Sequence, residues 1–222
     1  LVNRFSASAS EIFSGAIQDY GRGLIIGEQT YGKGTVQNLI DLNRLTSKSN
    51  KKFGQVKITI AKYYRVNGGS TQNLGVIPDI SFPTMIDPKD FGESSEPSAL
   101  PWDEIKSADF KKFSNLSEYL TKLKENHLNR ISTSKDFKYL LNDIELYKKN
   151  KEKTFLSLNE AIRKKEKEME EIRKFEREGK IQEDNGAELL DDETPQIETK
   201  NDDYILEESA KILSDLILLT IG

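Results

Sequence analysis

Apolar residues near the start of the chain follow a helical pattern first and a strand pattern after it. A helical face is predicted by apolar positions three and four apart, and Gly21 supplies a stop. The run at residues 24–26 lies between glycines and is typical of a buried strand. Residues 1–2 read as the end of another strand, so we expect a strand-helix-strand unit. The helical face consists of Ile12, Phe13, Ala16, Ile17 and Tyr20.

The clearest strand in the sequence lies at residues 56–64. Apolar and polar residues alternate there, which is the two-residue period of a strand with one covered face. The pair Asn67 and Gly68 predicts a hairpin turn, because both residues tolerate a positive φ. We therefore expect residues 75–80 to form the return strand.

Beyond residue 83 the pattern becomes helical. A stretch rich in proline, glycine and serine at residues 83–101 predicts a linker. Two helices that pack through apolar stripes are predicted after it. The first stripe is Leu116, Leu120, Leu123, Leu128 and Ile131, and the second is Phe137, Leu140, Leu141 and Ile144.

The C-terminal part alternates apolar and charged segments. Residues 155–158 predict a short strand, and Asn159 is placed to cap a charged helix that runs to about Glu178. This helix is dense in Lys, Arg and Glu, so we expect a solvated surface with ion pairs four residues apart. Residues 180–203 are acidic and polar and predict a mobile loop. An apolar stripe at 205–217 predicts a last helix, too short in its apolar part for a membrane span.

These elements predict an α/β fold with a mixed sheet, followed by an all-helical C-terminal domain. We place the first domain at residues 1–86 and the helical domain at residues 87–222, with the mobile acidic loop near 180–203 inside the second. The change from strand periodicity to helical periodicity after the linker is the basis of this division.

Composition narrows the classes of function. Of 222 residues, 33 are basic and 37 acidic, and the net charge of −4 is too small to indicate nucleic acid or a membrane surface as a partner. The chain has no cysteine, which excludes disulfides, thiolate chemistry and cysteine-based zinc sites. The chain begins at Leu1, so we expect a fragment, and the lack of a targeting segment says nothing about localisation.

Candidate chemistry gathers at the start of the first helix. The alternating serines Ser6, Ser8 and Ser10 lead into it, where unpaired amides and the helix dipole favour a developing negative charge. The oxyanion of acyl transfer is such a charge. A structural alternative stays open, because Ser8 and Glu11 have the spacing of a capping box.

Lys33 is the candidate general base. It stands between two glycines, which allow close backbone approach and add no shielding side chain. A lysine held out of water loses its proton more easily and can then accept one from a serine hydroxyl. His127 is the only histidine and lies in an ordinary polar helical pattern, so a Ser-His-Asp triad would have to use it. A Ser-Lys pair is the main catalytic option.

Five separated blocks resemble the C-terminal processing peptidases, above all the bacterial tail-specific protease subgroup. The family's active-site blocks are similar to RFSASASEI at residues 4–12, QDYGR at 18–22 and GKGTVQ at 32–37. Its core-closing strands are similar to YRVNGGSTQ at 64–72 and GVIPDI at 75–80. Residues 100–103 and 175–180 resemble the long helical tail of the subgroup, so the likeness covers nearly the whole chain.

The resemblance implies roles for individual residues. The nucleophile of the family falls on Ser8, its general base on Lys33, and the glutamine that orients the lysine on Gln37. The supporting aspartate falls on Asp19, about three helical turns after Ser8, so it would organise the fold and not relay a proton. A solvated helix-end carboxylate is the alternative for this aspartate. The amide of Ala9 would hold the oxyanion.

The resemblance also implies the activity and its setting. It implies a serine endopeptidase, a carboxy-terminal processing peptidase with a crotonase/ClpP-like core, of which residues 1–86 would be the second half. The first half of that core and a PDZ domain would lie upstream, so the fragment alone would be inactive. Protein or peptide substrates with exposed C-termini, a periplasmic or cell-envelope location and no cofactor or metal would follow. An adaptor protein stays open as a further partner, and no nucleic acid or membrane-spanning segment is expected.

Two other classes of function remain. One is a non-catalytic binding module of the same fold, as in the retinoid-binding repeats of the eye, and the presence of both Ser8 and Lys33 speaks against it. The other is an adaptor or interaction role for the helical domain.

Overall fold

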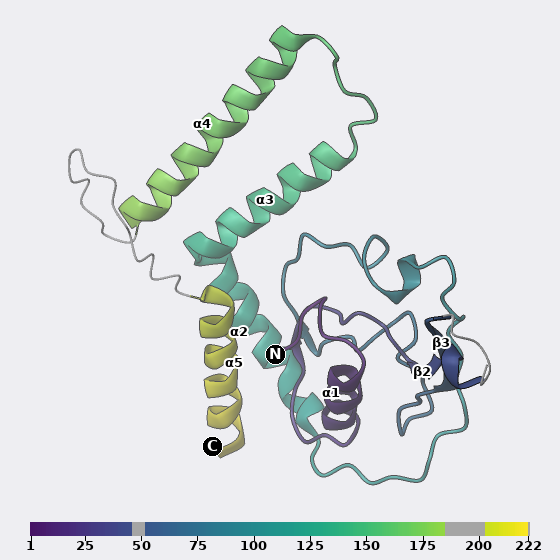
Figure 1. Cartoon of the computed structure of the whole chain (residues 1–222). Coiled ribbons are helices and arrows are strands. Elements are labelled where there is room, and N and C mark those ends of the chain that lie inside the picture. Colours follow the sequence, from purple (N-terminus) through teal and green to yellow (C-terminus); the bar gives the residue numbers. More distant parts are fainter. Residues whose placement is uncertain (46–51, 185–202, 222) are drawn as a thin grey trace. The chain divides into compact units, whose positions relative to one another are not determined.

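A computed structural model of the chain describes residues 1–45, 52–184 and 203–221 (Figure 1). Packing divides the chain into two compact units, one of residues 1–145 with 203–222 and one of residues 146–202. The domain boundary between residues 86 and 87 stays a prediction. The elements are α1 (Ala9–Asp19), β1 (Ile26–Gly27), β2 (Thr35–Asp41), β3 (Gln55–Lys62), β4 (Ile80–Ser81), α2 (Leu120–Thr133), α3 (Lys135–Lys151), α4 (Glu160–Asp184) and α5 (Tyr204–Ile221), with short 3-10 turns at Leu42–Leu45, Glu93–Ser95 and Leu116–Tyr119.

The strand-helix-strand unit predicted at the N-terminus forms in outline, but residues 1–2 contribute one isolated bridge and the second strand is Ile26–Gly27 and not residues 24–26. Val2 pairs in parallel with Gly27 across the intervening helix α1. β1 also pairs in parallel with β4, with Ile26 opposite Ile80. Short parallel strands joined through a helix give the mixed α/β character that the sequence predicts.

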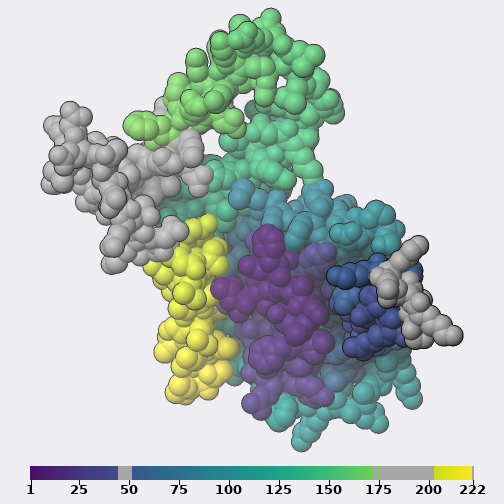
Figure 2. Space-filling view, viewed as in Figure 1, coloured from purple at the N-terminus to yellow at the C-terminus, as the bar shows by residue number. Residues whose placement is uncertain are grey.

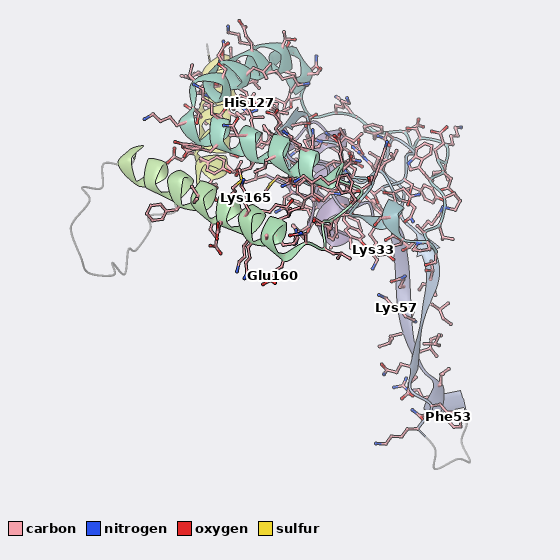
Figure 3. All side chains as sticks on the ribbon, turned by 90° about the horizontal axis from the view of Figure 1, so that it is seen from above. Lys33, Phe53, Lys57, His127, Glu160 and Lys165 are labelled. Atoms are coloured by element: carbon pink, nitrogen blue, oxygen red, sulfur yellow. The ribbon has the colours of Figure 1, made fainter. Side chains whose placement is uncertain are left out.

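β2 and β3 form an antiparallel hairpin that carries one side of the candidate site. Thr35 lies opposite Lys62 and Asp41 opposite Gln55, with an irregularity between Val36 and Gln37. In Figure 3 the hairpin extends as a long arm, with Lys33 at its base and Phe53 near its tip. Most of its side chains are exposed or half-buried on both faces.

The predicted strand at 56–64 is confirmed as β3, but the predicted return strand at 75–80 is wrong. Only Ile80–Ser81 is a strand there, and it pairs with β1. The turn at Asn67 and Gly68 does form, with Gly68 at φ 92°. It closes a single bridge, Tyr64 to Ser70, and Gly69 next to it pairs with Glu104, which lies just beyond the linker. The segment after the linker thus takes the edge that a longer hairpin would have used.

Two apolar clusters hold the first unit together. Val2, Ile25 and Val76 form one cluster, against which Ile17 of α1 packs. The other joins the small parallel sheet to the helices α2 and α5, and consists of Ile26, Ile80, Phe82, Leu123 and Ile212. Figure 2 shows α5 in yellow on the surface beside the N-terminal residues in purple. The predicted helices α2, α3 and α5 are confirmed.

The unit of residues 146–202 contains α4. Asn159 caps this helix by accepting the Ala161 amide at 3.0 Å, as predicted. The expected surface ion pairs are present, with Lys164 to Glu160 at 2.8 Å and Lys167 to Glu171 at 3.6 Å. α4 continues to Asp184, so part of the predicted loop at 180–203 is helical, and the rest lies outside the described residues except for residue 203.

The short strand predicted at residues 155–158 is wrong. Phe155 is 82% exposed and Leu158 98% exposed, and within the described ranges no neighbouring backbone pairs with them. A strand requires a partner for its amide and carbonyl groups, which a short apolar run cannot supply by itself.

Candidate active site

Ser8 immediately precedes α1 and has an unusual backbone conformation. Its φ of 54° and ψ of −111° are uncommon for a residue other than glycine. Such strain costs about 1–3 kcal/mol and persists only where the surrounding structure enforces it. Strained residues concentrate at functional sites. The Ser8 side chain is exposed, and Ser8 and Glu11 form the capping box that their spacing predicts, with the Glu11 carboxylate accepting the Ser8 amide at 2.8 Å. The capping alternative for Ser8 is therefore present in the structure, and the strained backbone is the observation that points beyond it.

A single pocket brings together the residues expected to react. Ser8, Ala9, Lys33 and Gln37 all line a cavity of about 370 Å³. Ser8 comes from the start of α1, Lys33 from the loop before β2, and Gln37 from β2 itself. Among the described residues no hydrogen bond joins the Ser8 hydroxyl to the Lys33 amine, so the pocket gathers these groups without fixing a dyad. The other residues around it are Ile12, Gly34, Thr35, Val36, Lys57 and Tyr63.

The Glu11 carboxylate ties the two halves of this pocket together. Glu11 is fully buried on the first turn of α1. One of its oxygens accepts the amides of Ser8 at 2.8 Å and Lys33 at 2.9 Å. The other accepts the Gly32 amide at 2.6 Å and the Thr30 hydroxyl at 2.6 Å. A buried charge is tolerated only with such partners, so Glu11 fixes the Ser8 backbone relative to the Lys33 backbone.

The helix start leaves one donor available near Ser8. The Ser10 amide donates to the Ala7 carbonyl oxygen at 3.1 Å. The amides of Glu11 and Ile12 donate to the Ser8 carbonyl oxygen at 2.9 Å and 3.0 Å. The Ala9 amide is the first of α1, and the first amides of a helix have no intrahelical acceptor. Since Ala9 also lines the pocket, its amide can donate to an anion held there.

Asp19 lies at the other end of α1, away from Ser8 and Lys33. It is only 8% exposed and accepts two hydrogen bonds from Arg65, at 2.6 Å and 2.8 Å. Asn67 donates to the same carboxylate at 3.1 Å. The reading of Asp19 as a solvated helix-end carboxylate is therefore wrong. The ion pair fixes the turn at residues 65–69 against the end of α1.

Arg4 and Gln72 are site residues to which the sequence analysis assigns no role. Arg4 is 1% exposed and donates to the carbonyl oxygens of Thr30, Phe91 and Pro88, the last two at 2.6 Å and 2.8 Å. Burial lowers the pKa of the Arg4 guanidinium, which nearby carboxylates oppose. Gln72 is fully buried and accepts the Gly34 amide at 3.0 Å. Both residues belong to the quoted blocks RFSASASEI and YRVNGGSTQ, and that membership is the signal that could have found them.

Tyr63, which directly follows β3, lines the same pocket as Ser8. Burial raises the pKa of the Tyr63 phenol, with Arg65 opposing the rise. The phenol therefore stays protonated at neutral pH and can donate a hydrogen bond into the pocket. The Tyr63 amide meanwhile donates to the Gly34 carbonyl oxygen at 2.7 Å, which fixes β3 beside the Lys33 loop.

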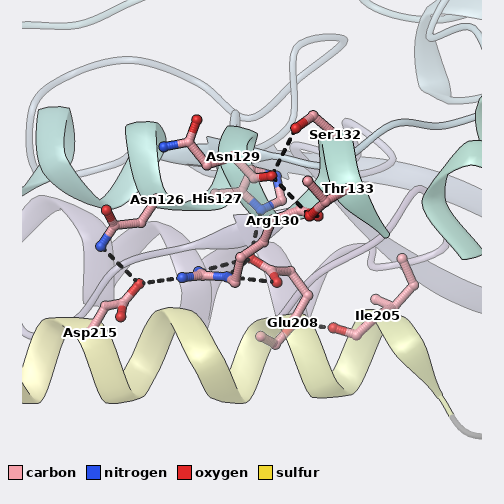
Figure 4. Close-up of polar contacts among 10 residues, drawn as sticks. Asn126, His127, Asn129, Arg130, Ser132, Thr133, Ile205, Glu208 and Asp215 are labelled. Carbon is pink, nitrogen blue, oxygen red and sulfur yellow. Dashed lines mark hydrogen bonds and ion pairs between the residues drawn. The ribbon is translucent and has the colours of Figure 1, made fainter. Parts of the chain in front are cut away.

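His127 is not in an ordinary polar setting, which corrects the sequence interpretation. It is 3% exposed and stacks on Phe82, with ring centroids 4.9 Å apart. Its Nδ1 lies 2.9 Å from the buried Glu208 carboxylate, which also binds Arg130 (Figure 4). Arg130 reaches on to Asp215 at 2.7 Å. His127 does not line the Ser8 pocket, so its role is to join α2 to α5 and the core.

Neither a metal-ligand cluster nor a membrane-spanning helix occurs in the residues that the structure describes. In these ranges no group of three or more His, Asp or Glu side chains is placed to hold a metal ion. No helix there combines the length and the apolar content that crossing a bilayer requires.

Comparison with known proteins matches the chain along almost its entire length. Residues 1–82 match peptidase family S41, and residues 86–218 match the C-terminal domain of tail specific protease. The tail-specific protease of Haemophilus influenzae is 40% identical over 228 residues, which is 98% of this chain and 32% of that protein. The carboxy-terminal-processing protease of Bartonella bacilliformis is 46% identical over 80 residues, 36% of this chain and 17% of that protein.

A solved structure, the photosystem II D1 C-terminal processing protease, is 40% identical over 40% of this chain and 20% of its own, with a TM-score of 0.31. The chain spans about a third of the length of the Haemophilus protease and less of the Bartonella protease. Two family matches that together cover both halves of the sequence agree with the blocks around Ser8 and Lys33. The chain belongs to the tail-specific proteases of peptidase family S41.

Proposed function

We propose that this chain carries the catalytic pair of a serine endopeptidase, with Ser8 as nucleophile and Lys33 as general base. The observation that carries the proposal is the shared pocket, in which a strained serine at a helix start and a lysine are tied through one buried carboxylate. Glu11 reaches both backbones, so the separation of the two residues is set before a substrate binds. The names of the relatives, which are proteases, support the same reaction class.

Acylation begins when neutral Lys33 accepts the proton of the Ser8 hydroxyl. The Ser8 oxygen then bonds to the scissile carbonyl carbon, and the carbonyl π pair moves to oxygen as an oxyanion. The amide of Ala9 donates to that oxyanion, and a second donor comes from a part of the relatives that this chain does not span. Collapse of the intermediate breaks the C–N bond, and Lys33 returns its proton to the leaving amine.

Deacylation repeats the same steps with water as the nucleophile. Lys33 takes a proton from water, the hydroxide adds to the acyl carbon, and the Ser8 oxygen leaves with the proton. Gln37 borders the same pocket from β2, where its amide can orient the Lys33 amine. Asp19 takes no proton, because its carboxylate is engaged by Arg65 and Asn67.

The substrates of the proposed enzyme are proteins recognised near their C-termini, in the cell envelope. The names of the relatives, carboxy-terminal-processing and tail-specific protease, support action near the C-termini of proteins. β2 and β3 form a two-stranded sheet among the described residues, and an extended peptide can pair with the outer edge of such a sheet. An adaptor protein remains an open partner.

Substitution of the two reacting groups tests the proposal in the full-length protein. Ser8→Ala and Lys33→Ala should each lower kcat/KM for a peptide substrate by roughly a thousandfold or more, with folding retained, because each removes a chemical participant. Lys33→Arg should fail as well, since arginine stays protonated. Ser10→Ala and Lys106→Ala are matched controls on exposed residues and should keep normal activity.

The same proteins separate an enzyme from a binding module. A serine-directed acylating probe should label the wild type and Ser10→Ala but not Ser8→Ala. A folded wild type that hydrolyses no peptide and resists the probe would favour the binding module. Near-normal activity of Lys33→Ala would remove lysine from the mechanism.

A further inference from the structure

The backbone of the loop that carries Lys33 is held at every residue from Tyr31 to Gly34. The Tyr31 amide donates to the Ser6 carbonyl oxygen at 2.9 Å, and the Gly32 carbonyl oxygen accepts the Asn73 amide at 2.8 Å. Glu11 accepts the amides of Gly32 and Lys33. None of these bonds involves the Gly34 amide, which directly follows Lys33 and needs an acceptor from another segment.

Gln72 holds that amide, and it does so from a fully buried position. Its Oε1 accepts the Gly34 amide at 3.0 Å. The Gln72 backbone also lies close, because a Cβ on Gly34 would be 2.5 Å from the Gln72 backbone nitrogen, so only glycine fits at this position. A buried amide side chain with its acceptor used on one side requires acceptors for its own N–H groups on the other.

Those acceptors come from the segment of residues 88–100, here called the strap. The Gln72 Nε2 donates to the Glu93 carboxylate at 3.2 Å and to the Leu100 carbonyl oxygen at 3.1 Å. The strap also binds the Lys33 loop directly, because the Glu93 amide donates to the Tyr31 carbonyl oxygen at 3.0 Å. Phe91 packs edge-on against Tyr31, with ring centroids 5.6 Å apart.

The strap is seated by close contact. A Cβ on Gly92 would lie 2.2 Å from an Arg4 nitrogen and 2.7 Å from the Tyr31 oxygen. Arg4 in turn donates to the strap carbonyl oxygens of Pro88 and Phe91. The strap lies within residues 86–218, the part that matches the C-terminal domain of tail specific protease.

We infer that the strap, acting through Gln72, positions Lys33, so that the start of the C-terminal domain is a working part of the active site. Gln72 is a positioning residue, because it contacts the backbone next to Lys33 and not the reacting atoms. The inference rests on the proposed role of Lys33 as general base. Its consequence is that changes in the strap alter the rate of the chemical step more than substrate binding.

The test uses the full-length protein with Gln72→Met and Glu93→Ala. Methionine has the same unbranched length as glutamine but lacks the strong acceptor and both donors, so the volume stays filled while the hydrogen bonds are lost. Glu93 is half-buried, and its substitution to Ala removes one acceptor of Gln72 at little cost to the core. Gln29→Met and Glu118→Ala are matched controls outside the strap, since the Gln29 side chain donates to the Leu74 carbonyl oxygen and Glu118 is exposed.

Two readouts separate positioning from general stability. Per folded molecule, kcat of Gln72→Met should fall roughly tenfold to a hundredfold with little change in KM, equally for a small activated ester and for a protein substrate. The kcat of Glu93→Ala should also fall, but by a smaller factor. The kcat of both controls should match that of the wild type. Hydrogen exchange of the amides at residues 32–34 should speed up in both variants before any global unfolding.

The outcomes are distinguishable from those of the proposed function. If Lys33→Ala is inactive while folded Gln72→Met keeps normal kcat and normal exchange at residues 32–34, the inference fails and the dyad stands. If Lys33→Ala is active, the dyad fails, and the exchange data still decide whether the strap holds the loop. Should Gln72→Met not fold, unchanged kcat and exchange in Glu93→Ala would overturn the inference, and a fall in kcat with faster exchange would support it.

Discussion

At the scale of single residues, Glu11 connects the serine to the lysine. Its two oxygens accept three amides and one hydroxyl, and all four donors belong to Ser8 or to the loop at residues 30–33. An ionised carboxylate suits this arrangement because it offers acceptors only. Each bond to a charged group contributes about 1.5–3 kcal/mol when it is buried.

We expect Glu11→Gln to damage both stability and catalysis. The glutamine amide brings N–H donors toward other N–H donors, so at least one buried amide loses its acceptor, at a cost of about 1–3 kcal/mol. The Ser8 and Lys33 backbones then lose their common anchor, and kcat should fall roughly tenfold or more. Thermal unfolding and kcat of the full-length protein check this, with Glu118→Gln on the exposed surface as control. Unchanged kcat in folded Glu11→Gln would rule out an anchoring role.

The second residue-scale prediction concerns pH. If Lys33 is the base, kcat/KM should rise with pH, because only the neutral amine accepts the serine proton. Gln37→Ala should weaken or displace this rise, since an orienting neighbour in the pocket is lost. His127→Gln should leave it in place, because His127 is buried between α2 and α5 and away from the pocket.

The measurement is a pH profile of kcat/KM for the wild type and the two variants, each corrected for its folded fraction. If kcat/KM no longer rises with pH in His127→Gln but still rises as in the wild type in Gln37→Ala, the base is histidine instead.

At the scale of elements, α1 buries its polar face. Glu11, Ser14, Gly15 and Asp19 are buried, while Phe13 is 69% exposed. The apolar face predicted from the sequence is thus mostly not the one that packs, apart from Ile17 and from Tyr20, which meets Phe110 and Phe113 edge-on. Hydrogen bonds from the loop and from Arg65 compensate the buried carboxylates, which is why the inverted orientation is stable.

The Asp19 and Arg65 pair should therefore matter for folding and not for proton transfer. Removing one partner of a buried ion pair leaves the other charge uncompensated and costs about 3–5 kcal/mol, so Asp19→Ala should lower the melting temperature clearly. The molecules that remain folded should keep the pH dependence of the wild type. Asp109→Ala, at an exposed aspartate, should change neither property.

Denaturant unfolding and pH profiles of the full-length variants provide the check. If folded Asp19→Ala keeps the stability of the wild type but its kcat/KM rises over a different pH range, Asp19 belongs to the proton pathway instead.

At the scale of the whole molecule, residues 1–222 alone should not degrade proteins. The chain spans 32% of the Haemophilus tail-specific protease, and the proposed mechanism takes one oxyanion donor from outside the chain. Loss of one such donor costs about 2.7–4 kcal/mol in the transition state. Incubation of the folded chain with a protein substrate and a small ester checks this expectation. Robust proteolysis by residues 1–222 would show that the site is complete as it stands.

Local structure follows from local sequence in several parts of this chain. The helices α2, α3 and α5 were predictable because their apolar stripes repeat at helical spacing, and β3 because its residues alternate. Asn159 was identified as a cap from its position alone, and its side chain does cap α4. In each case the determining interactions lie within a few residues of one another.

The pairing of distant segments was not predictable in the same way. The partner of β3 is β2 and not residues 75–80, and Glu104 from beyond the linker occupies the edge at Gly69. His127 reads as a polar helical residue, yet it stacks on Phe82. The strand expected at residues 155–158 lacks a backbone partner among the described residues.

The sequence by itself determined which reactive groups the chain has, where its main helices and its longest strand lie, and, through the blocks around Ser8 and Lys33, the peptidase family. Only the tertiary structure decided which face of α1 is buried, that Ser8 is strained, and that Glu11 and Gln72 hold the amides around Lys33. The physical reason is the separation along the sequence of the groups that interact. Periodicity and capping are short-range, whereas those amides meet acceptors far away in the sequence, and burial alone makes each such bond obligatory.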